Sequence, residues 1–211
     1  MTASPTDVRR RRTVIVAAPA VLAVMYPVFR LTGYMFGGRA DGYLAWAAGL
    51  AVYWLLSGTA FPLWALGWPT IRKLLRPSRA DRLTMVLVAV PAVIVAIDRL
   101  AVGVATYQRS SQVALLPLTV TAFGNGFFEE LLWRGVYLRL FVDRRCYRVV
   151  WPSVWFGLWH VAPVTARHGP VLAYVLGAML LGLYLAFITR RTGGVFWPIV
   201  AHTCAALVAI A

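Results

Sequence analysis

The amino-acid sequence predicts an all-α fold, a polytopic membrane helical bundle of about seven transmembrane helices with a cytoplasmic N-terminus. Three observations lead to this prediction. Of the 211 residues, 61% are hydrophobic and only 13% are charged, whereas a soluble domain carries about 25% charged residues. Seven apolar segments are long enough to approach or cross a hydrocarbon core of about 30 Å. Basic residues gather in alternate loops between these segments.

The apolar segments follow one another without a flexible linker, a low-complexity tract or an internal repeat, so we expect one integral membrane unit. They cover residues 13–29, 43–66, 83–97, 113–138, 149–165, 171–188 and 195–211. The first continues through two prolines to Phe29 without a small-residue cleavage site, so we expect an uncleaved span rather than a signal peptide. The third is the weakest, because Asp98 and Arg99 cut it short. We divide the chain into an N-terminal transmembrane region of three spans, residues 1–112, and a core of four spans, residues 113–211.

Four segments on one predicted side of the membrane hold 15 of the 21 Lys and Arg residues. They are Arg9–Arg12, then Arg72, Lys73, Arg76, Arg79 and Arg82, then Arg139, Arg144, Arg145 and Arg148, and finally Arg190 and Arg191. Such residues concentrate in cytoplasmic loops, which predicts a multi-pass protein of the cell membrane with an odd number of crossings. The net charge of +14 is then a consequence of topology. We therefore expect the lipid bilayer as a partner, and no nucleic acid.

The only two glutamates, Glu129 and Glu130, are adjacent and lie inside the fourth apolar segment. An ionisable group in hydrocarbon costs a few kcal/mol, so it is normally paired, faces a cavity or serves function. Glu130 and Arg134 are four residues apart, on one helix face, which predicts an ion pair. Glu129 is rotated from Glu130 by about 100° and therefore needs a different partner.

Two histidines are predicted to reach the depth of this glutamate pair. Glu129 lies ten residues before Arg139, His160 twelve after Arg148, and His202 eleven after Arg191. At 1.5 Å per residue these offsets are roughly 15, 18 and 16 Å. We thus expect Glu129, His160 and His202 in one layer near the middle of the membrane. The third histidine, His168, is expected in a solvated outer loop.

This set of side chains is typical of hydrolysis. A glutamate beside a histidine can activate water, and a second histidine can donate to a developing oxyanion. Two histidines and a carboxylate also match a zinc site with an open position for water, in which Glu129, His160 and His202 are the candidate ligands. The sequence lacks the H-E-x-x-H motif. Spacing alone leaves open whether the site uses no metal or a divalent metal such as zinc.

Three ordered motifs resemble the CPBP family, also called the Abi or CAAX-protease-like family. They are Glu129-Glu130-x-x-x-Arg134, Phe156-x-x-x-His160, and the run from Gly194 to His202. The family includes type II CAAX prenyl endopeptidases and bacterial proteins associated with bacteriocin processing and self-immunity. The resemblance implies an intramembrane endopeptidase that acts on a peptide or protein substrate. Glu129 would activate water, His160 would assist it, His202 would be an oxyanion donor or metal ligand, and Glu130 and Arg134 would orient the site.

One position departs from the family pattern. The last motif usually ends in an asparagine four residues after the histidine, where this chain has Ala206. Asn125, four residues before Glu129, is our candidate for the missing amide. Ala206 also favours the main alternative, a catalytically impaired immunity or scaffold protein. A proton-coupled transporter is a further alternative, although the two halves show no mirrored broken helices.

Overall fold

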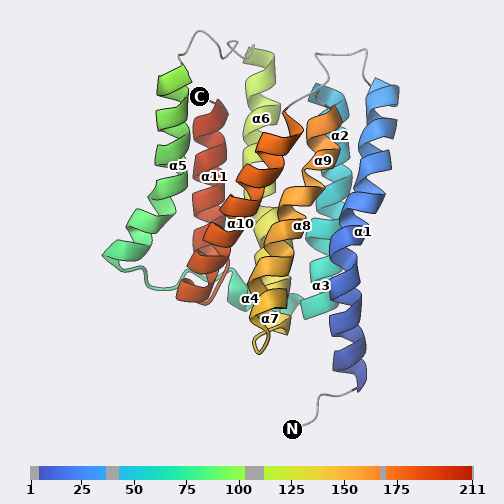
Figure 1. Cartoon of the computed structure of the whole chain (residues 1–211), viewed down its shortest axis with the longest axis vertical. Coiled ribbons are helices and arrows are strands. Elements are labelled where there is room, and N and C mark those ends of the chain that lie inside the picture. Colours follow the sequence, from blue (N-terminus) through green and yellow to red (C-terminus); the bar gives the residue numbers. More distant parts are fainter. Residues whose placement is uncertain (1–4, 37–42, 103–111, 167–169, 211) are drawn as a thin grey trace.

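Each of the seven predicted segments lies in a helical rod of the computed structural model, which describes residues 5–36, 43–102, 112–166 and 170–210. Successive rods run in opposite directions along the long axis of the molecule (Figure 1). Four of the rods are single, uninterrupted helices. These four are α1 (Pro5–Phe36), α5 (Arg82–Val102), α10 (Val171–Thr192) and α11 (Phe196–Ile210). The described secondary structure is entirely helical, so the all-α prediction is confirmed.

The other three rods are composite, because π-helical turns interrupt them. The second rod consists of α2 (Tyr43–Tyr53), η2 (Trp54–Ala60) and α3 (Phe61–Leu66), and the short α4 (Trp68–Leu74) follows it. The fourth consists of α6 (Gln112–Gly124), η3 (Asn125–Glu129), η4 (Leu131–Val136) and α7 (Tyr137–Leu140). The fifth consists of η5 (Cys146–Val150), α8 (Trp151–Trp159) and α9 (Val161–Ala166), with a turn at His160.

Four helical stretches are long and apolar enough to cross a membrane by length and composition. They are Asp7–Phe36, Leu44–Leu66, Arg82–Leu100 and Val171–Thr192. The apolar helix Phe196–Ala209 is shorter. The first helix is longer than its apolar part, because arginine is a good helix former and α1 already includes Arg9–Arg12. The total of about seven crossings and the cytoplasmic N-terminus stay predictions.

The basic segments meet at one end of the bundle. The start of α1, α4, α7 and the end of α10 all lie at the lower end in Figure 1. Arg11 pairs with Asp143 at 3.2 Å and Arg191 pairs with Asp81 at 2.5 Å, which ties distant basic segments together. Glycines with positive φ end α3 and α10 at this end, Gly67 (72°) and Gly193 (74°). We call it the arginine-rich end.

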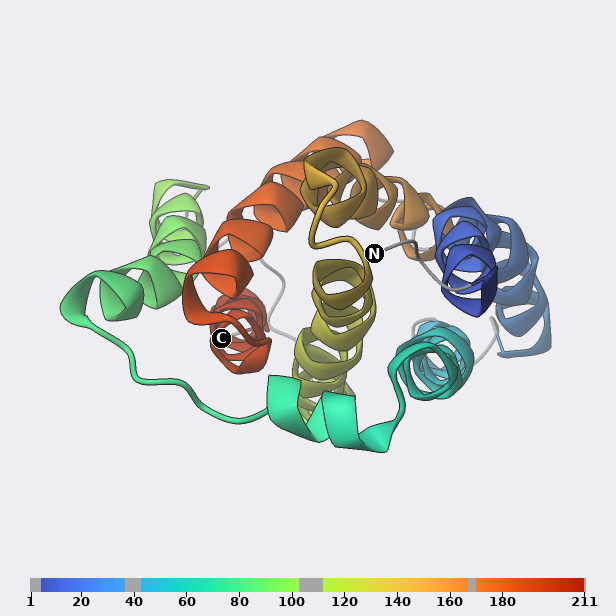
Figure 2. The ribbon, with the colours of Figure 1, turned by 90° about the horizontal axis from the view of Figure 1, so that it is seen from below.

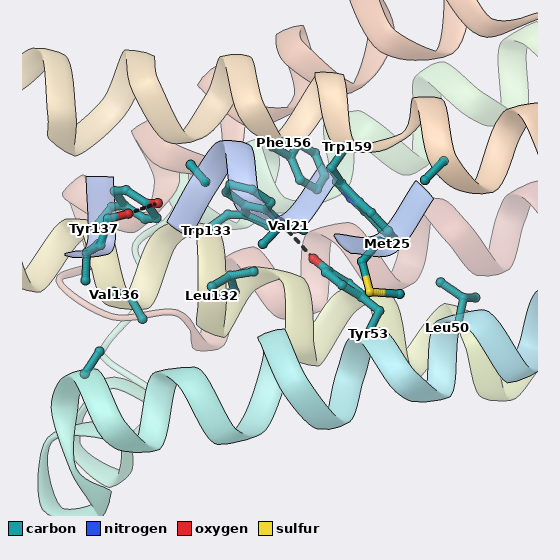
Figure 3. Packing of buried hydrophobic residues seen from close by; sticks show 14 of the residues in the cluster. Val21, Met25, Leu50, Tyr53, Leu132, Trp133, Val136, Tyr137, Phe156 and Trp159 are labelled. Carbon is teal, nitrogen blue, oxygen red and sulfur yellow. Dashed lines mark hydrogen bonds between the residues drawn. The ribbon is translucent and has the colours of Figure 1, made fainter. Parts of the chain in front are cut away.

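The rod that carries Glu129 is the centre of the molecule. Viewed from the arginine-rich end, it is surrounded by the other helices, with α1 and α5 on opposite sides (Figure 2). The main buried cluster packs α1, α2 and α8 around it, and Figure 3 shows ten of these side chains labelled. Its hydrogen bonds cross between helices: Trp133 donates to the Tyr53 hydroxyl at 2.9 Å, and Tyr137 donates to the Val14 carbonyl at 2.8 Å. Such bonds help to hold membrane helices together, and here they join residues 1–112 to residues 113–211.

Candidate active site

The central rod becomes π-helical where the two glutamates lie. Glu130 separates η3 from η4, and its side chain, like that of Glu129, has no exposed surface. Turns of this kind are rare and often mark functional positions, since they turn side chains away from the regular helical register. Gly126 lies one turn before the pair and contacts Thr203 of α11. Because no Cβ intervenes, α11 comes close enough to place His202 beside the glutamates.

Glu130 is the centre of a buried polar network. Its Oε1 accepts hydrogen bonds from Arg134 Nη1 at 2.8 Å and from His202 Nδ1 at 3.0 Å. The Arg134 guanidinium also lies 4.2 Å from the centre of the Phe156 ring, a distance at which a cation and an aromatic face attract. The predicted pairing of Glu130 with Arg134 is confirmed. The network orients the His202 ring through a third side chain, which the sequence did not indicate.

Glu129 has no comparable partner. Both carboxylate oxygens are buried and accept no hydrogen bond from the described residues. The imidazole of His202 lies beside this carboxylate, with its Nε2 3.7 Å from Oε2. The indole N–H of Trp159 lies near the carboxylate and is also buried without a hydrogen bond. The Glu129 carboxylate and the Trp159 N–H group therefore lie close together inside the bundle, each without a hydrogen bond among the described residues.

His160 lies at the turn between α8 and α9. Its Nδ1 is 2.6 Å from the Phe156 carbonyl oxygen. Since a carbonyl oxygen only accepts, Nδ1 carries the proton, and in a neutral ring Nε2 is left as an acceptor. The rings of His160 and His202 both stand edge-on to Phe156, at 4.9 and 6.0 Å. The structure thus brings both predicted histidines to the same aromatic ring.

A cavity of about 330 Å³ opens beside His160. Asn125, Trp159 and His160 line it, together with residues from the start of α2, from α9 and from the start of α10. Trp54 donates a hydrogen bond from Nε1 to Asn125 Oδ1 at 3.0 Å. The oxygen of this amide is therefore occupied, and its NH2 group remains available to the cavity.

The described residues do not offer a ready metal site. No group of three His, Cys, Asp or Glu side chains among them is arranged to hold a metal ion. His202 Nδ1 is held by Glu130 and its Nε2 faces Glu129, an orientation that a metal ligand could share, but no third donor side chain among the described residues joins these two in a metal-binding arrangement. A zinc site formed by Glu129, His160 and His202 would require these side chains to move.

The sequence motifs located most of this site, but not all of it. Glu129, Glu130, Arg134 and His202 are in contact, and His160 and Asn125 face the adjoining cavity. His168 lies outside the described residues. Trp54 and Tyr53, which hold Asn125 and Trp133, were missed. Their only trace in the sequence is an aromatic pair in an apolar segment, a pattern that is common in membrane helices.

Comparison with known families agrees with the motifs. Residues 110–208 match the family model described as type II CAAX prenyl endopeptidase Rce1-like. The resemblance predicted from the three motifs is therefore confirmed, and the family is one of proteases. No curated protein and no solved structure matches the chain. The Rce1-like segment contains every predicted site residue, whereas Trp54 and Tyr53 precede it.

Proposed function

We propose that the chain is an intramembrane endopeptidase that hydrolyses a peptide bond of a membrane-associated peptide or protein with water activated by Glu129. One observation carries the proposal: a carboxylate inside the bundle has both oxygens buried and unpaired. Keeping such a group among apolar helices is costly, and function is the usual reason for it. The protease family of residues 110–208 supports peptide hydrolysis as that function.

The network around Glu130 determines where a water molecule can bind. Glu130 Oε1 accepts from Arg134 Nη1 and lies 3.0 Å from His202 Nδ1, so we assign the Nδ1 proton of His202 as the donor to the same oxygen. A neutral His202 then turns its Nε2 lone pair toward Glu129 Oε2, 3.7 Å away. Nε2 and Oε2 are both acceptors and cannot bond to each other directly. A water molecule can donate one hydrogen bond to each of them. We place the attacking water there.

The reaction then needs two proton movements. As the water oxygen attacks the peptide carbonyl carbon, Glu129 accepts a proton and the carbonyl oxygen becomes an oxyanion. When the C–N bond breaks, Glu129 passes that proton to the leaving nitrogen, and the products are a carboxylic acid and an amine. The Asn125 NH2 group supplies an oxyanion donor in place of the amide that Ala206 lacks. His160 assists as an acceptor that orients water through Nε2.

The cavity also bears on how the substrate enters. Its outer lining includes Trp46, Pro170 and Tyr174, which lie where α2 and α10 begin. In Figure 1 these helices begin at the end opposite the arginine-rich end. We therefore infer entry from the arginine-poor side, which the positive-inside rule makes the outer side of the cell membrane.

Cleavage by the purified full-length chain tests the proposal. Wild type and Glu129→Gln are reconstituted in lipid nanodiscs with a library of membrane-anchored peptides, and the products are identified by mass spectrometry. We expect site-specific products from wild type and a loss of about 100- to 10,000-fold in Glu129→Gln, the usual contribution of a general base. Asp81→Asn, the same chemical change in an exposed loop, is the control and should cleave normally. Equal activity of wild type and Glu129→Gln would refute the proposed role.

A thiol-labelling experiment tests the direction of entry separately. Tyr174 is 56% exposed at the cavity mouth. Tyr174→Cys is made in a background where the exposed Cys146 and Cys204 are replaced by serine, and oriented vesicles are treated with a bulky impermeant maleimide. Labelling from the arginine-poor side should block cleavage. Labelling only from the other side, or labelling that leaves cleavage intact, contradicts this route of entry while leaving the hydrolytic role of Glu129 standing.

A further inference from the structure

A second groove, separate from the active site, lies at the arginine-rich end. It has a volume of about 380 Å³ and lies between the first turns of α1 and the turn that follows α7. Its polar lining consists of Arg11, Arg12, Asp143 and Arg144. Three guanidinium groups thus share one groove with a single carboxylate. Neither the Rce1-like match nor the proposed hydrolysis gives this groove a role.

The carboxylate of this groove, that of Asp143, is already paired with Arg11. Arg11 Nη1 donates to both oxygens of Asp143, at 3.2 and 3.3 Å. A hydrogen bond from its own backbone N–H, together with the nearby charges of Arg11 and Arg144, lowers the pKa of Asp143. Among the described residues no carboxylate lies in ion-pair contact with Arg12 or Arg144. The groove therefore carries two positive charges in excess.

The floor of the groove is apolar, and aromatic residues continue from it along the fifth rod. Phe141 is buried beneath the arginines, with the Arg11 guanidinium 5.9 Å from its ring centre. Tyr147 packs on Phe141 at 5.7 Å and on Trp151 at 6.1 Å, and Trp151 donates to the Ile15 carbonyl at 3.2 Å. Tyrosine and tryptophan concentrate at the level of lipid headgroups. The groove thus has a charged rim toward water and an apolar wall toward the bilayer.

From this combination we propose that the groove binds the headgroup of an anionic phospholipid from the leaflet at the arginine-rich end. The phosphodiester oxygens bond to Arg12 and Arg144, whose planar guanidinium groups suit phosphate. The first methylene groups of the lipid lie against Ile15 and Phe141. Basic pockets between membrane helices at this level are suited to acidic lipids. The Arg11–Asp143 pair shapes the site by fixing α1 on the turn after α7.

The test uses the full-length chain in a neutral detergent, titrated with phosphatidylglycerol or phosphatidylcholine. Native mass spectrometry counts the bound lipids, and thermal melting follows stabilisation. We expect wild type to retain phosphatidylglycerol selectively and Arg12→Gln/Arg144→Gln to bind it about 10- to 100-fold more weakly, since each arginine near an acidic lipid surface contributes about 1 kcal/mol. Arg12→Lys/Arg144→Lys, which keeps the charge, should recover part of the affinity.

The matched control is Arg72→Gln/Arg76→Gln, which removes the same charge from exposed positions of the same end outside the groove. It should bind phosphatidylglycerol within about threefold of wild type. Equal weakening in both double variants would overturn the proposal in favour of diffuse attraction to the basic end. Equal stabilisation by soluble glycerol phosphate would overturn it in favour of a site for free phosphate esters.

Discussion

The buried Glu130–Arg134 pair allows the sharpest test of how this site is held together. Both side chains are at most 2% exposed, and the pair is joined at 2.8 Å. Arg134→Leu would leave the Glu130 carboxylate inside the bundle with His202 as its only remaining partner. Glu130→Leu would remove the ion-pair partner of the guanidinium, whose Nη2 already lacks a hydrogen-bond partner among the described residues, and leave it against the Phe156 ring. Leaving one charge of a buried pair uncompensated typically costs about 3–5 kcal/mol.

The double variant Glu130→Leu/Arg134→Leu separates the energetic effect of the ion pair from the effect of side-chain packing. Leucine is of similar size to both side chains, and replacing a whole buried pair by apolar residues is often nearly neutral. We expect Glu130→Leu/Arg134→Leu to lose about 2 kcal/mol or less, mainly because His202 loses its acceptor. The two single costs would then sum to about 6–10 kcal/mol, far above the cost of the double change.

The free energy of unfolding is measured by titration with a denaturing detergent in mixed micelles, followed by tryptophan fluorescence, for which the chain offers nine tryptophans. Asp143→Ala is the comparison, because the Arg11–Asp143 pair is exposed at 35% and 59% and solvent-exposed ion pairs contribute little to stability. Single-variant losses as small as this control, or single losses that simply add in the double variant, would refute the account of Glu130 and Arg134 as a tightly coupled pair.

Three further outcomes are expected. Asn125→Ala should lower kcat about 100- to 1,000-fold, the usual loss for one oxyanion donor, and an unchanged kcat would remove that residue from the mechanism. Trp54→Phe, which keeps an aromatic side chain but loses the indole N–H and part of the packing on Gly124, should lower kcat less. Cleavage should survive exhaustive chelation, because no described donor set suits a metal, and activity that disappears and returns with zinc would contradict this. Hydrogen bonds from Thr84, and then the Arg191 charge, lower the pKa of Asp81 from 3.8 to about 2. The stabilisation from the ionised Asp81 is therefore complete above about pH 4 and is lost as the pH falls toward 2. Asp81→Asn should flatten the plot of melting temperature against pH in this range, and an unchanged plot would show that Asp81 is not responsible.

The sequence predicted the helical rods and the charged part of the site for one physical reason. In an apolar chain an ionisable side chain is costly, so Glu129, Glu130 and Arg134 stand out, and helical spacing alone pairs Glu130 with Arg134. The number of residues that separates each side chain from the nearest basic loop predicted similar membrane depths for His202 and Glu129, and the two side chains are in contact. The helix bounds were less accurate for α1, because an apolar pattern marks the part in lipid and not the turns that continue into water.

The orientation of each side chain depends on packing that no motif encodes. His202 and His160 are both histidines on apolar helices, yet one is bonded to Glu130 and the other to the backbone at Phe156. The difference arises because α11 closely approaches the central rod at Gly126, while His160 stands at the turn that ends α8. The sequence left open a metal site with Glu129, His160 and His202 as candidate ligands, and among the described residues no group of three such side chains is arranged to hold a metal ion.

The N-terminal helices resemble no family motif, yet the site depends on them. The Trp54 ring lies against the backbone of Gly124, where any Cβ would overlap it. This close approach allows the Trp54 indole to reach Asn125 and hold the amide with its NH2 group free for the cavity. A larger residue at position 124 would displace Trp54 and release Asn125 without touching a single residue of the three motifs. Residues 1–112 therefore contribute to the candidate active site through packing, and under the proposed mechanism Trp54 holds in place the amide that Ala206 does not supply.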